Sequence, residues 1–478
     1  MNNLSSRSES YLYEQVVEKM TGLIGQGVLR PGDRIPSVRR LSLQMHVSIS
    51  TVLQAYLLLE SRGLIEARPQ SGYYVKVRAE KIPPEPRTST PYASATPVGV
   101  GELVSKVLQA ASHPEIVPLG AGVPSPDLLP VRQLNHVMAA IGRRRGAAAI
   151  GYDFPPGNEG LRRQIARRSL DWGCHLSTDE IVTTCGGMEA LNLCLRAVAN
   201  PGDTIVIESP TFFGVLQVIE SLKMKALEIA THPRDGIDLE ALERAVKRNK
   251  VRACILIPNF NNPLGSCMPE KNKKSLVEIL ARREIPLIED DIYGDLYFGV
   301  TRPKTVKAFD KHGLVLLCSS FSKNLAPGYR VGWTAPGRFK FKVEQLKFMN
   351  TLATASLPQM TIAQFLDSGG YDRHLRRLRK SLATQVQRIS LAISRYFPEG
   401  TRVTRPSGGF VLWVELPKSV NSLELHRKAL REKISIIPGC LFSAKKRYQN
   451  FIRLSCGHPW SDRLEQALIT LGRLAGKD

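Results

Sequence analysis

Residues 319–333 contain the side chains whose types and spacing are best suited to chemistry. Lys323 follows a short apolar run typical of a buried strand; Ser320 and Ser322 lie three and one residues before it, and Arg330 lies seven after it. The amine can form an imine with an aldehyde, and the hydroxyls with the guanidinium can hold a phosphate dianion. A single Lys in a Ser-rich turn is commonly an exposed surface residue, so this segment alone leaves both interpretations open.

Two further segments offer groups to a phosphate and to an aromatic ring. Gly187 and Met188 lie where a glycine-containing loop opens a predicted helix, so their backbone N–H groups can bind phosphate. Phe212 follows a predicted strand and can stack on a pyridine ring. Because glycine pairs open many helices and Phe is commonly a core residue, each pattern is weak by itself.

Two more segments carry polar groups that suit the same ring. The Asn262 amide can bind a ring oxygen, and Tyr293 can donate a hydrogen bond to that oxygen. Asp290 ends an apolar run, where it can pair with a pyridine nitrogen and keep it protonated, which makes the ring an electron sink.

The elements that position these residues alternate from about residue 102 to the end. Apolar, β-rich runs at 204–208, 253–258, 286–290 and 314–318 are separated by helical patterns. This alternation predicts an α/β fold with a mostly parallel sheet.

Taken in order, these segments resemble the fold-type I, class I/II aminotransferases over residues 116–475. The resemblance implies pyridoxal 5′-phosphate (PLP) as the cofactor. It assigns catalytic roles to Lys323, as the imine-forming lysine, and to Asp290 and Tyr293. Cofactor binding is assigned to Lys323, Gly187, Met188, Phe212, Asn262, Asp290, Tyr293, Ser320, Ser322 and Arg330.

The same resemblance gives roles to two residues outside these segments. Tyr152 matches a tyrosine that reaches the phosphate of a neighbouring subunit, and Arg453 matches the arginine that binds a substrate α-carboxylate bidentately. Met188 stands where a polar residue is common and Leu264 where Thr is common, but neither change removes a reacting group.

Residues 11–78 follow a different pattern, with three helical segments and then two strand-like runs at 63–67 and 72–77. Ser37 and Ser48 precede the second and third helices as N-caps. Val52, Tyr56 and Leu59 are expected to face inward on the third helix, and Leu12, Val16, Met20 and Leu23 on the first. The pattern predicts a small α+β winged helix-turn-helix whose third helix enters the DNA major groove.

Residues 32–41, with Val47-Ser48 and Thr51-Val52, resemble the GntR-type winged helix. Ile49 stands where that family often has Arg, so a contact to guanine is lost or replaced by an apolar contact to a thymine methyl. A protein-interaction module is the alternative. The resemblance implies DNA contacts by Arg34, Ser37, Arg39, Ser48, Ser50, Thr51, Arg68, Ser71 and Gly72.

Three parts follow from these patterns: a DNA-binding domain at 1–78, a linker at 79–100, and a PLP-binding domain at 101–478 with a small subdomain from about 370. The linker contains five prolines, which favour a semi-extended chain.

Composition limits the class of protein. The net charge is +23, and only nine Lys/Arg against five Asp/Glu lie within residues 11–78, so most of the excess lies in the large domain. This indicates either solvated helix faces or a second contact with DNA phosphates. Eight scattered cysteines and the absence of a long apolar run predict a reduced, cytoplasmic protein with no bound metal and no membrane span.

The order of the two domains resembles the MocR subfamily of GntR-type regulators. That resemblance implies a head-to-tail homodimer that binds a DNA operator and an amino acid or amine effector, sensed by aldimine exchange at Lys323. Two alternatives stay open. One is an active aminotransferase with an accessory DNA-binding domain, since the catalytic residues are apparently complete. The other is a regulator that responds to PLP itself, which Arg453 disfavours.

Overall fold

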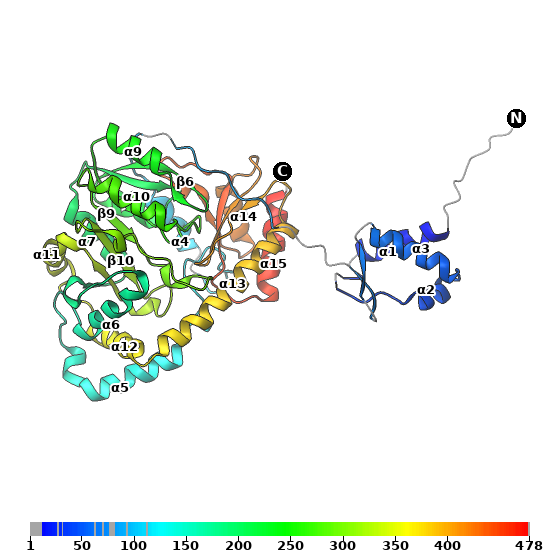
Figure 1. Ribbon diagram of the computed structural model, residues 1–478, viewed down its shortest axis with the longest axis horizontal. Helices are drawn as coiled ribbons and strands as arrows, with labels where there is room; N and C mark the ends of the chain where they lie inside the picture. The colour runs from blue at the N-terminus through cyan, green and yellow to red at the C-terminus, as the bar shows by residue number, and fades with distance from the viewer. Residues whose placement is uncertain are drawn as a thin grey trace. The chain divides into compact units, whose positions relative to one another are not determined.

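The computed structural model describes residues 12–25, 28–30, 32–61, 64–68, 71–75, 82–91, 94–110 and 113–476. The chain divides into two compact units, residues 1–81 and 82–478 (Figure 1).

The smaller unit contains three helices and a hairpin, as predicted. The antiparallel strands pair Ile65 with Val75 and Arg68 with Gly72. The elements are α1 (Leu12–Gly25), α2 (Val38–Met45), α3 (Ile49–Ser61), β1 (Ile65–Arg68) and β2 (Gly72–Val75).

The core of this unit lies between α1, α3 and the hairpin. Val52, Tyr56 and Leu59 are fully buried, as the pattern on α3 predicts, whereas Leu12 at the start of α1 is 58% exposed, contrary to prediction. Each fully buried apolar side chain contributes roughly 1.5–3 kcal/mol to folding. The Tyr56 hydroxyl donates to the Pro36 carbonyl at 2.7 Å, so its polar end is satisfied.

Both predicted N-caps form. The Ser37 hydroxyl accepts from the Arg40 N–H at 3.3 Å at the start of α2. The Ser48 hydroxyl accepts from the Thr51 N–H at 3.1 Å at the start of α3. Each cap satisfies one of the N–H groups that a helix leaves unpaired at its first turn.

The larger unit is built on a nine-stranded sheet that is mostly parallel, as predicted. Strands β6, β5, β8, β9 and β10 run parallel to one another, and β11 is antiparallel to β10 and to β4. The spatial order is β3 (Thr96–Pro97), β6 (Lys225–His232), β5 (Thr204–Ser209), β8 (Val251–Leu256), β9 (Leu287–Asp290), β10 (Val315–Ser320), β11 (Gly332–Ala335) and β4 (Val182–Thr184), with β7 (Gly236–Ile237) beside β6.

Helices cover both faces of this sheet, because alternate side chains of a strand point to opposite faces. On β5, Ile205 and Ile207 pack in the core that includes α7 and α8, whereas Val206 packs in the core that includes α9 and α10. The helices of this part are α4 (Gly101–Ala110), α5 (Val131–Ile150), α6 (Glu159–Ser169), α7 (Gly187–Val198), α8 (Phe213–Ser221), α9 (Leu239–Arg248), α10 (Glu270–Ala281), α11 (Lys340–Thr351) and α12 (Ser356–Asp367).

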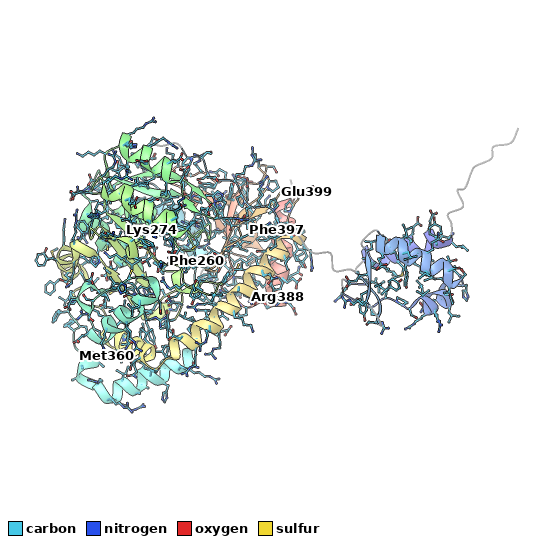
Figure 2. All side chains as sticks on the ribbon, viewed as in Figure 1. Phe260, Lys274, Met360, Arg388, Phe397 and Glu399 are labelled. Carbon is cyan, nitrogen blue, oxygen red and sulfur yellow. The ribbon has the colours of Figure 1, made fainter. Side chains whose placement is uncertain are left out.

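A smaller antiparallel sheet and three helices complete the unit from residue 370. Helix α13 (Gly370–Tyr396) is about 40 Å long at 1.5 Å per residue. Figure 2 labels Met360 on α12, Arg388 on the second half of α13 and Phe397 just beyond its end. The remaining elements are β12 (Arg402–Val403), β13 (Val411–Glu415), β14 (Ile437–Pro438), β15 (Phe451–Ser455), α14 (Ser422–Arg431) and α15 (Asp462–Gly476), with the strand order β12-β13-β15-β14.

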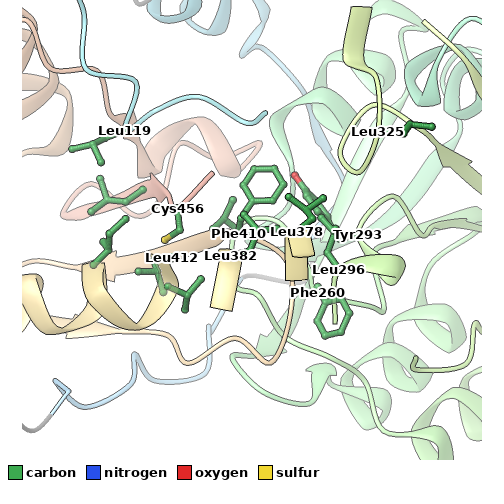
Figure 3. Close-up of a cluster of buried hydrophobic side chains, with 14 of the residues drawn as sticks. Leu119, Phe260, Tyr293, Leu296, Leu325, Leu378, Leu382, Phe410, Leu412 and Cys456 are labelled. Atoms are coloured by element: carbon green, nitrogen blue, oxygen red, sulfur yellow. The ribbon is translucent and has the colours of Figure 1, made fainter. Parts of the chain in front are cut away.

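A third apolar core joins this subdomain to the large sheet (Figure 3). Leu378 and Leu382 of α13 lie in the same cluster as Leu412 of β13 and as Phe260 and Tyr293, which follow strands of the large sheet. The Tyr293 and Phe410 rings meet edge to face, with centroids 5.5 Å apart. Tyr293 therefore lies where the two parts of the unit meet.

The described part of the predicted linker packs against the larger unit. The Pro84 carbonyl accepts from the Val403 N–H at 2.9 Å, and the Ser89 hydroxyl accepts from the Thr231 N–H at 2.9 Å. Strand β3 pairs with β6 and is itself the edge strand, where a proline is tolerated because no further strand needs its N–H. The described residues of the predicted linker, 82–91 and 94–100, thus belong to the larger unit.

All eight cysteines are described, and none forms a disulfide. Within the described ranges, no helix has the length and apolarity to cross a membrane, and no three His, Cys, Asp or Glu residues gather as metal ligands would.

Candidate functional site

The carboxyl ends of the parallel strands meet at one edge of the sheet, and the predicted cofactor residues gather there. They follow β5, β8, β9 and β10, and α7 begins beside them. In α/β sheets this edge is the usual place of a ligand site. A cavity of about 100 Å³ is lined by Gly187, Met188, Phe212, Asn262, Asp290, Tyr293, Ser320, Ser322, Lys323 and Arg330, together with three apolar residues that the sequence did not single out, Leu191, Ile257 and Ile292.

Lys323 lies in the loop after β10, and its Nζ donates to the Gly122 carbonyl at 2.6 Å. Burial lowers the pKa of Lys323 to about 8, and the positive charge of Arg453 adds to this effect, while the negative charge of Asp290 opposes it. A larger fraction of this amine is therefore neutral near pH 7 than of an exposed lysine. A neutral amine is the form that attacks a carbonyl carbon.

Asp290 ends β9 with its carboxyl group inside the cavity. The group is buried and accepts one hydrogen bond, from the Ile292 N–H at 3.2 Å. Burial raises the pKa of Asp290 to about 7, and the negative charge of Asp291 adds to this effect, while no described cation forms an ion pair with the Asp290 carboxylate. A protonated pyridine nitrogen would provide that missing partner.

One end of the cavity is suited to a phosphate. Helix α7 begins without a side-chain cap, because its N-cap Gly186 has φ 87° and no side chain, so its first N–H groups are free to bind an anion. Arg330 donates to the Ser322 hydroxyl and to the Cys185 carbonyl, both at 3.3 Å. A Cβ at residue 186 would collide with the Arg330 guanidinium. Glycine is thus required for the guanidinium to lie beside the helix terminus.

Asn262 and Tyr293 lie on another wall of the cavity. The Asn262 amide donates to the Tyr293 hydroxyl at 3.5 Å, at the limit of a hydrogen bond, and Asn262 Oδ1 is buried without a partner. Burial raises the pKa of Tyr293 to about 12, so the phenol stays protonated and can donate. These polar groups fit a ligand with a ring oxygen, and together with Asp290 and the phosphate end they fit PLP.

A second cavity, of about 280 Å³, adjoins the first. Phe212, Asn262, Tyr293 and Lys323 line both, and Arg453 lines only the second. The amine of Lys323 is therefore accessible from the cavity that contains Arg453.

Arg453 on β15 is 1% exposed. Its Nη2 donates to the Gly120 carbonyl, its Nε is buried without a partner, and no carboxylate of the described residues forms an ion pair with it. Burial lowers the pKa of Arg453 to about 10, so the group is still cationic at neutral pH. A buried cation with a free donor is suited to a ligand carboxylate.

Tyr152 is the one predicted cofactor residue that lines neither cavity. It is 72% exposed and its ring lies 5.6 Å from that of Phe154. Because its predicted target is a neighbouring subunit, its role stays a prediction.

The sequence did not reveal how the loop after β9 is held. Arg302 forms ion pairs with Asp291 and, at 2.7 Å, with Asp295, and the Tyr371 hydroxyl donates to Asp295 at 2.8 Å. This buried group fixes the turn that carries Tyr293. Only the run of carboxylates at 289–295 was visible in the sequence, and nothing there indicates Arg302 as the partner.

The predicted DNA-contacting residues lie mostly on the surface of the smaller unit. Arg34, Ser37, Arg39, Ser48, Ser50, Arg68 and Gly72 are exposed, while Thr51 and Ser71 are partly buried. The hairpin tip at 69–70 lies outside the described residues.

Two of these surface residues already have partners. Arg68 pairs with Glu66 at 2.8 Å and lies 4.3 Å above the Tyr74 ring, so it must leave or share these partners to reach a phosphate. The Ser48 hydroxyl caps α3 and lies 2.8 Å from that of Ser50. Among the contacts found in the described residues, none ties the Arg39 guanidinium to a carboxylate.

Family models match both units. The model described as aminotransferase class I and II matches residues 114–469, and that of the bacterial regulatory proteins of the gntR family matches residues 12–75. The uncharacterized HTH-type transcriptional regulator YdcR of Escherichia coli K12 is 43% identical over 97% of this chain and 98% of its own length.

Solved structures resemble the larger unit. LysN, an alpha-aminoadipate aminotransferase of Thermus thermophilus complexed with N-(5′-phosphopyridoxyl)-L-leucine, is 30% identical with a TM-score of 0.72, over 78% of this chain and 94% of that one. A Pyrococcus horikoshii kynurenine aminotransferase is 29% identical with a TM-score of 0.73 over the same shares.

Proposed function

Because the chain belongs to the MocR subfamily of GntR-type transcription regulators, we propose that its larger unit senses an amino acid or amine through Lys323 and thereby changes DNA binding by the smaller unit. The chain is a DNA-binding transcription regulator whose larger unit, of the aminotransferase class I and II family, binds PLP. The observation that carries the proposal is the pair of adjoining cavities, with Lys323 between the cofactor residues and Arg453.

The chain's own residues divide the work of holding the cofactor. The α7 N-terminus, Ser320, Ser322 and Arg330 would hold the phosphate, Asp290 the ring nitrogen, and Asn262 with Tyr293 the ring oxygen. When bound, PLP supplies an aldehyde that couples to amines and a ring that accepts electrons.

The effector is recognised at two points. Arg453 would bind its carboxylate, and its amine would enter the cavity that the Lys323 amine also lines, where the bound cofactor would supply an aldehyde. A Lys323 amine that is not bound to the cofactor would be partly neutral and partly protonated near neutral pH, since its pKa is lowered to about 8. Freeing Lys323 in this way would change both the charge and the contacts of the loop after β10. That change alters DNA affinity only if the effector binds one conformation of the protein better than another.

The smaller unit reads DNA through α3 and the hairpin. Ser50 and Thr51 at the start of α3 face the bases or backbone, and Arg39 on α2 binds a phosphate. Ile49, which is 53% exposed, can make apolar contact with a thymine methyl.

We also infer a head-to-tail homodimer. Tyr152, Phe154 and Phe348 form an exposed aromatic group, with ring centroids 5.6 and 6.2 Å apart, which a second copy would cover. In such a dimer Tyr152 would reach the phosphate in the neighbouring subunit, and two DNA-reading units would bind two half-sites.

A working aminotransferase is the second candidate function. Lys323, Asp290 and Arg453 are all in place, and the resembling structures are aminotransferases. The freed Lys323 could then act as the base that moves a proton.

One experiment separates these functions. Amino acids and amines are titrated into the PLP-loaded protein while its visible absorption, its DNA affinity and the formation of keto acid are followed together. A ligand that shifts the band and changes DNA affinity without sustained keto acid supports the sensor. Steady formation of keto acid with constant DNA affinity would show that the protein is a working aminotransferase instead. A change in DNA affinity on adding PLP alone would show that the protein responds to PLP itself.

A further inference from the structure

A wide groove of the larger unit lies away from the cofactor site and is strongly basic. It has a volume of about 910 Å³ and runs between the first halves of α5 and α13, which are neighbours in Figure 1. Five Lys or Arg side chains line it, all exposed or partly exposed, and none of its lining residues is acidic: Arg132, Arg373, Arg376, Arg377 and Lys380.

Four of these cations form a stripe on α13. Arg373, Arg376, Arg377 and Lys380 have the i, i+3, i+4, i+7 spacing of one helix face, and Arg132 with His136 faces them from α5. The stripe rises about 10 Å along the helix. Duplex DNA carries about one phosphate charge per 1.7 Å of its axis, so a segment of this length meets several phosphates.

Cations elsewhere on the surface are balanced in a different way. On α4 Lys106 pairs with Glu102 at 2.6 Å, and on α9 Lys247 pairs with Glu243 at 3.0 Å, both at i,i+4. None of the five groove cations forms an ion pair with any described residue. The one acidic residue of α13, Asp372, pairs with Arg168 at 2.9 Å outside the groove.

Such a cluster of like charges lowers stability unless an anion compensates it. Local patterns that cost stability without an evident structural gain are expected at functional sites.

We propose that this basic groove binds the phosphate backbone of duplex DNA as a second contact, separate from the winged helix. The chain already carries a DNA-reading unit, so DNA bound there is held near the larger unit at a high effective concentration. Guanidinium groups bind phosphate oxygens bidentately and independently of base sequence. This inference rests on the proposed function, because both require that the protein binds DNA. It concerns residues of the larger unit, whereas the DNA-reading residues belong to the smaller unit.

The test uses the full-length, PLP-loaded protein and a duplex of random sequence, roughly four helical turns long, because backbone contacts need no operator. Arg376→Ala/Arg377→Ala is compared with Arg143→Ala/Arg144→Ala, which removes the same charge from exposed residues of α5 outside the groove. Circular dichroism and the PLP absorption band establish that each variant is folded.

The expected result is a change in salt dependence. The slope of log K against log salt should fall by about 1.8 in the groove variant, since each phosphate contact contributes about 0.9. Its affinity deficit should then be about tenfold larger at about 50 mM than at about 200 mM salt. The α5 control should keep the wild-type slope.

Three outcomes would overturn the proposal. An unchanged salt slope in the groove variant would show that DNA does not bind in the groove. An equal fall in both variants would indicate diffuse attraction by net charge. Unchanged DNA binding with a lost transcriptional response would assign the groove to an acidic protein partner. Arg39→Ala identifies failure of the proposed function separately, because that substitution tests only the smaller unit.

Discussion

The two units expose their functional side chains to opposite degrees. In the smaller unit, Arg39, Ser50 and their neighbours lie on the surface and come from one short stretch of the chain. In the larger unit, Asp290 and Arg453 are buried and come from strands far apart in the chain. A DNA duplex is met from outside, whereas a small ligand has to be surrounded. Burial accordingly lowers the pKa of Lys323 to about 8 and that of Arg453 to about 10, by excluding water from both cations.

This difference has a consequence for single substitutions. A buried group that loses its partner leaves an uncompensated charge or donor, which costs several kcal/mol. An exposed contact with a phosphate is one of several and is screened by salt. A single substitution in the buried site of the larger unit should therefore abolish most of the ligand binding. A single substitution in the DNA-reading unit should lower DNA affinity only partly.

The largest expected effect tests the separation of the two units. Lys323→Ala should abolish the absorption band that depends on the bond between Lys323 and the cofactor, because no other amine of the described residues lines the cavity. Binding of random-sequence duplex DNA by the smaller unit should not change. A parallel loss of DNA binding would mean that Lys323 is needed for DNA binding even without an effector; spectra and fluorescence anisotropy measure both quantities.

Arg453→Ala should lower the affinity for α-amino acids by about hundredfold, since it removes a buried charged partner worth about 2–5 kcal/mol. The readout is a titration of the absorption shift. Amines without a carboxylate are the matched control and should bind as before. An equal loss for amines and amino acids would indicate that Arg453 only supports the fold around Gly120.

Arg39→Ala should weaken DNA binding by about tenfold at low salt and reduce the salt slope by about 1, uniformly across sequences. The absorption band should be unchanged, since the substitution lies in the other unit. A change in sequence preference would instead show that Arg39 contacts bases.

The smallest effect concerns pH. The amine of Lys323 must be neutral to couple with the cofactor aldehyde, and its pKa is lowered to about 8, so lowering the pH below about 8 protonates it. The rate at which PLP-free protein takes up PLP should therefore fall about fivefold from about pH 8 to about pH 7, as the neutral fraction of the amine does. Stopped-flow absorbance measures this rate. A fall of about tenfold over that range would mean that the amine keeps the pKa of an exposed lysine, and a flat profile would mean that its pKa lies below about 7.

Local patterns were sufficient for the smaller unit. Ser37 and Ser48 are caps because of their place before apolar-periodic segments, and Val52, Tyr56 and Leu59 are buried because of their spacing. The exposed Leu12 was predicted wrongly, since periodicity gives a helix face but not whether another element covers its first turn.

The candidate PLP site was predictable as a set of residue types but not as a geometry. The strand end at Asp290 could be located from an apolar run, whereas the run at 314–318 stops two residues before the end of β10 at Ser320. The sequence did not allow the prediction that the Gly122 carbonyl accepts a hydrogen bond from Lys323, or that Arg302 forms an ion pair with Asp291. Gly122 and Arg302 lie in segments without a pattern of their own. Packing at 82–100 was likewise hidden, since prolines favour an extended chain whether or not it lies against a sheet edge.

By itself, the sequence determined the types of chemistry that this protein carries: an amine, a carboxylate and hydroxyls after strands, and basic and hydroxyl groups on a winged helix. Only the tertiary structure decided which groups are buried together, and hence that Lys323 lies between two cavities and that Arg453 retains an unpaired Nε. It also decided that the cations of α13 and α5 share one groove. The physical reason is that burial and charge proximity depend on contacts between distant segments, which no local periodicity records.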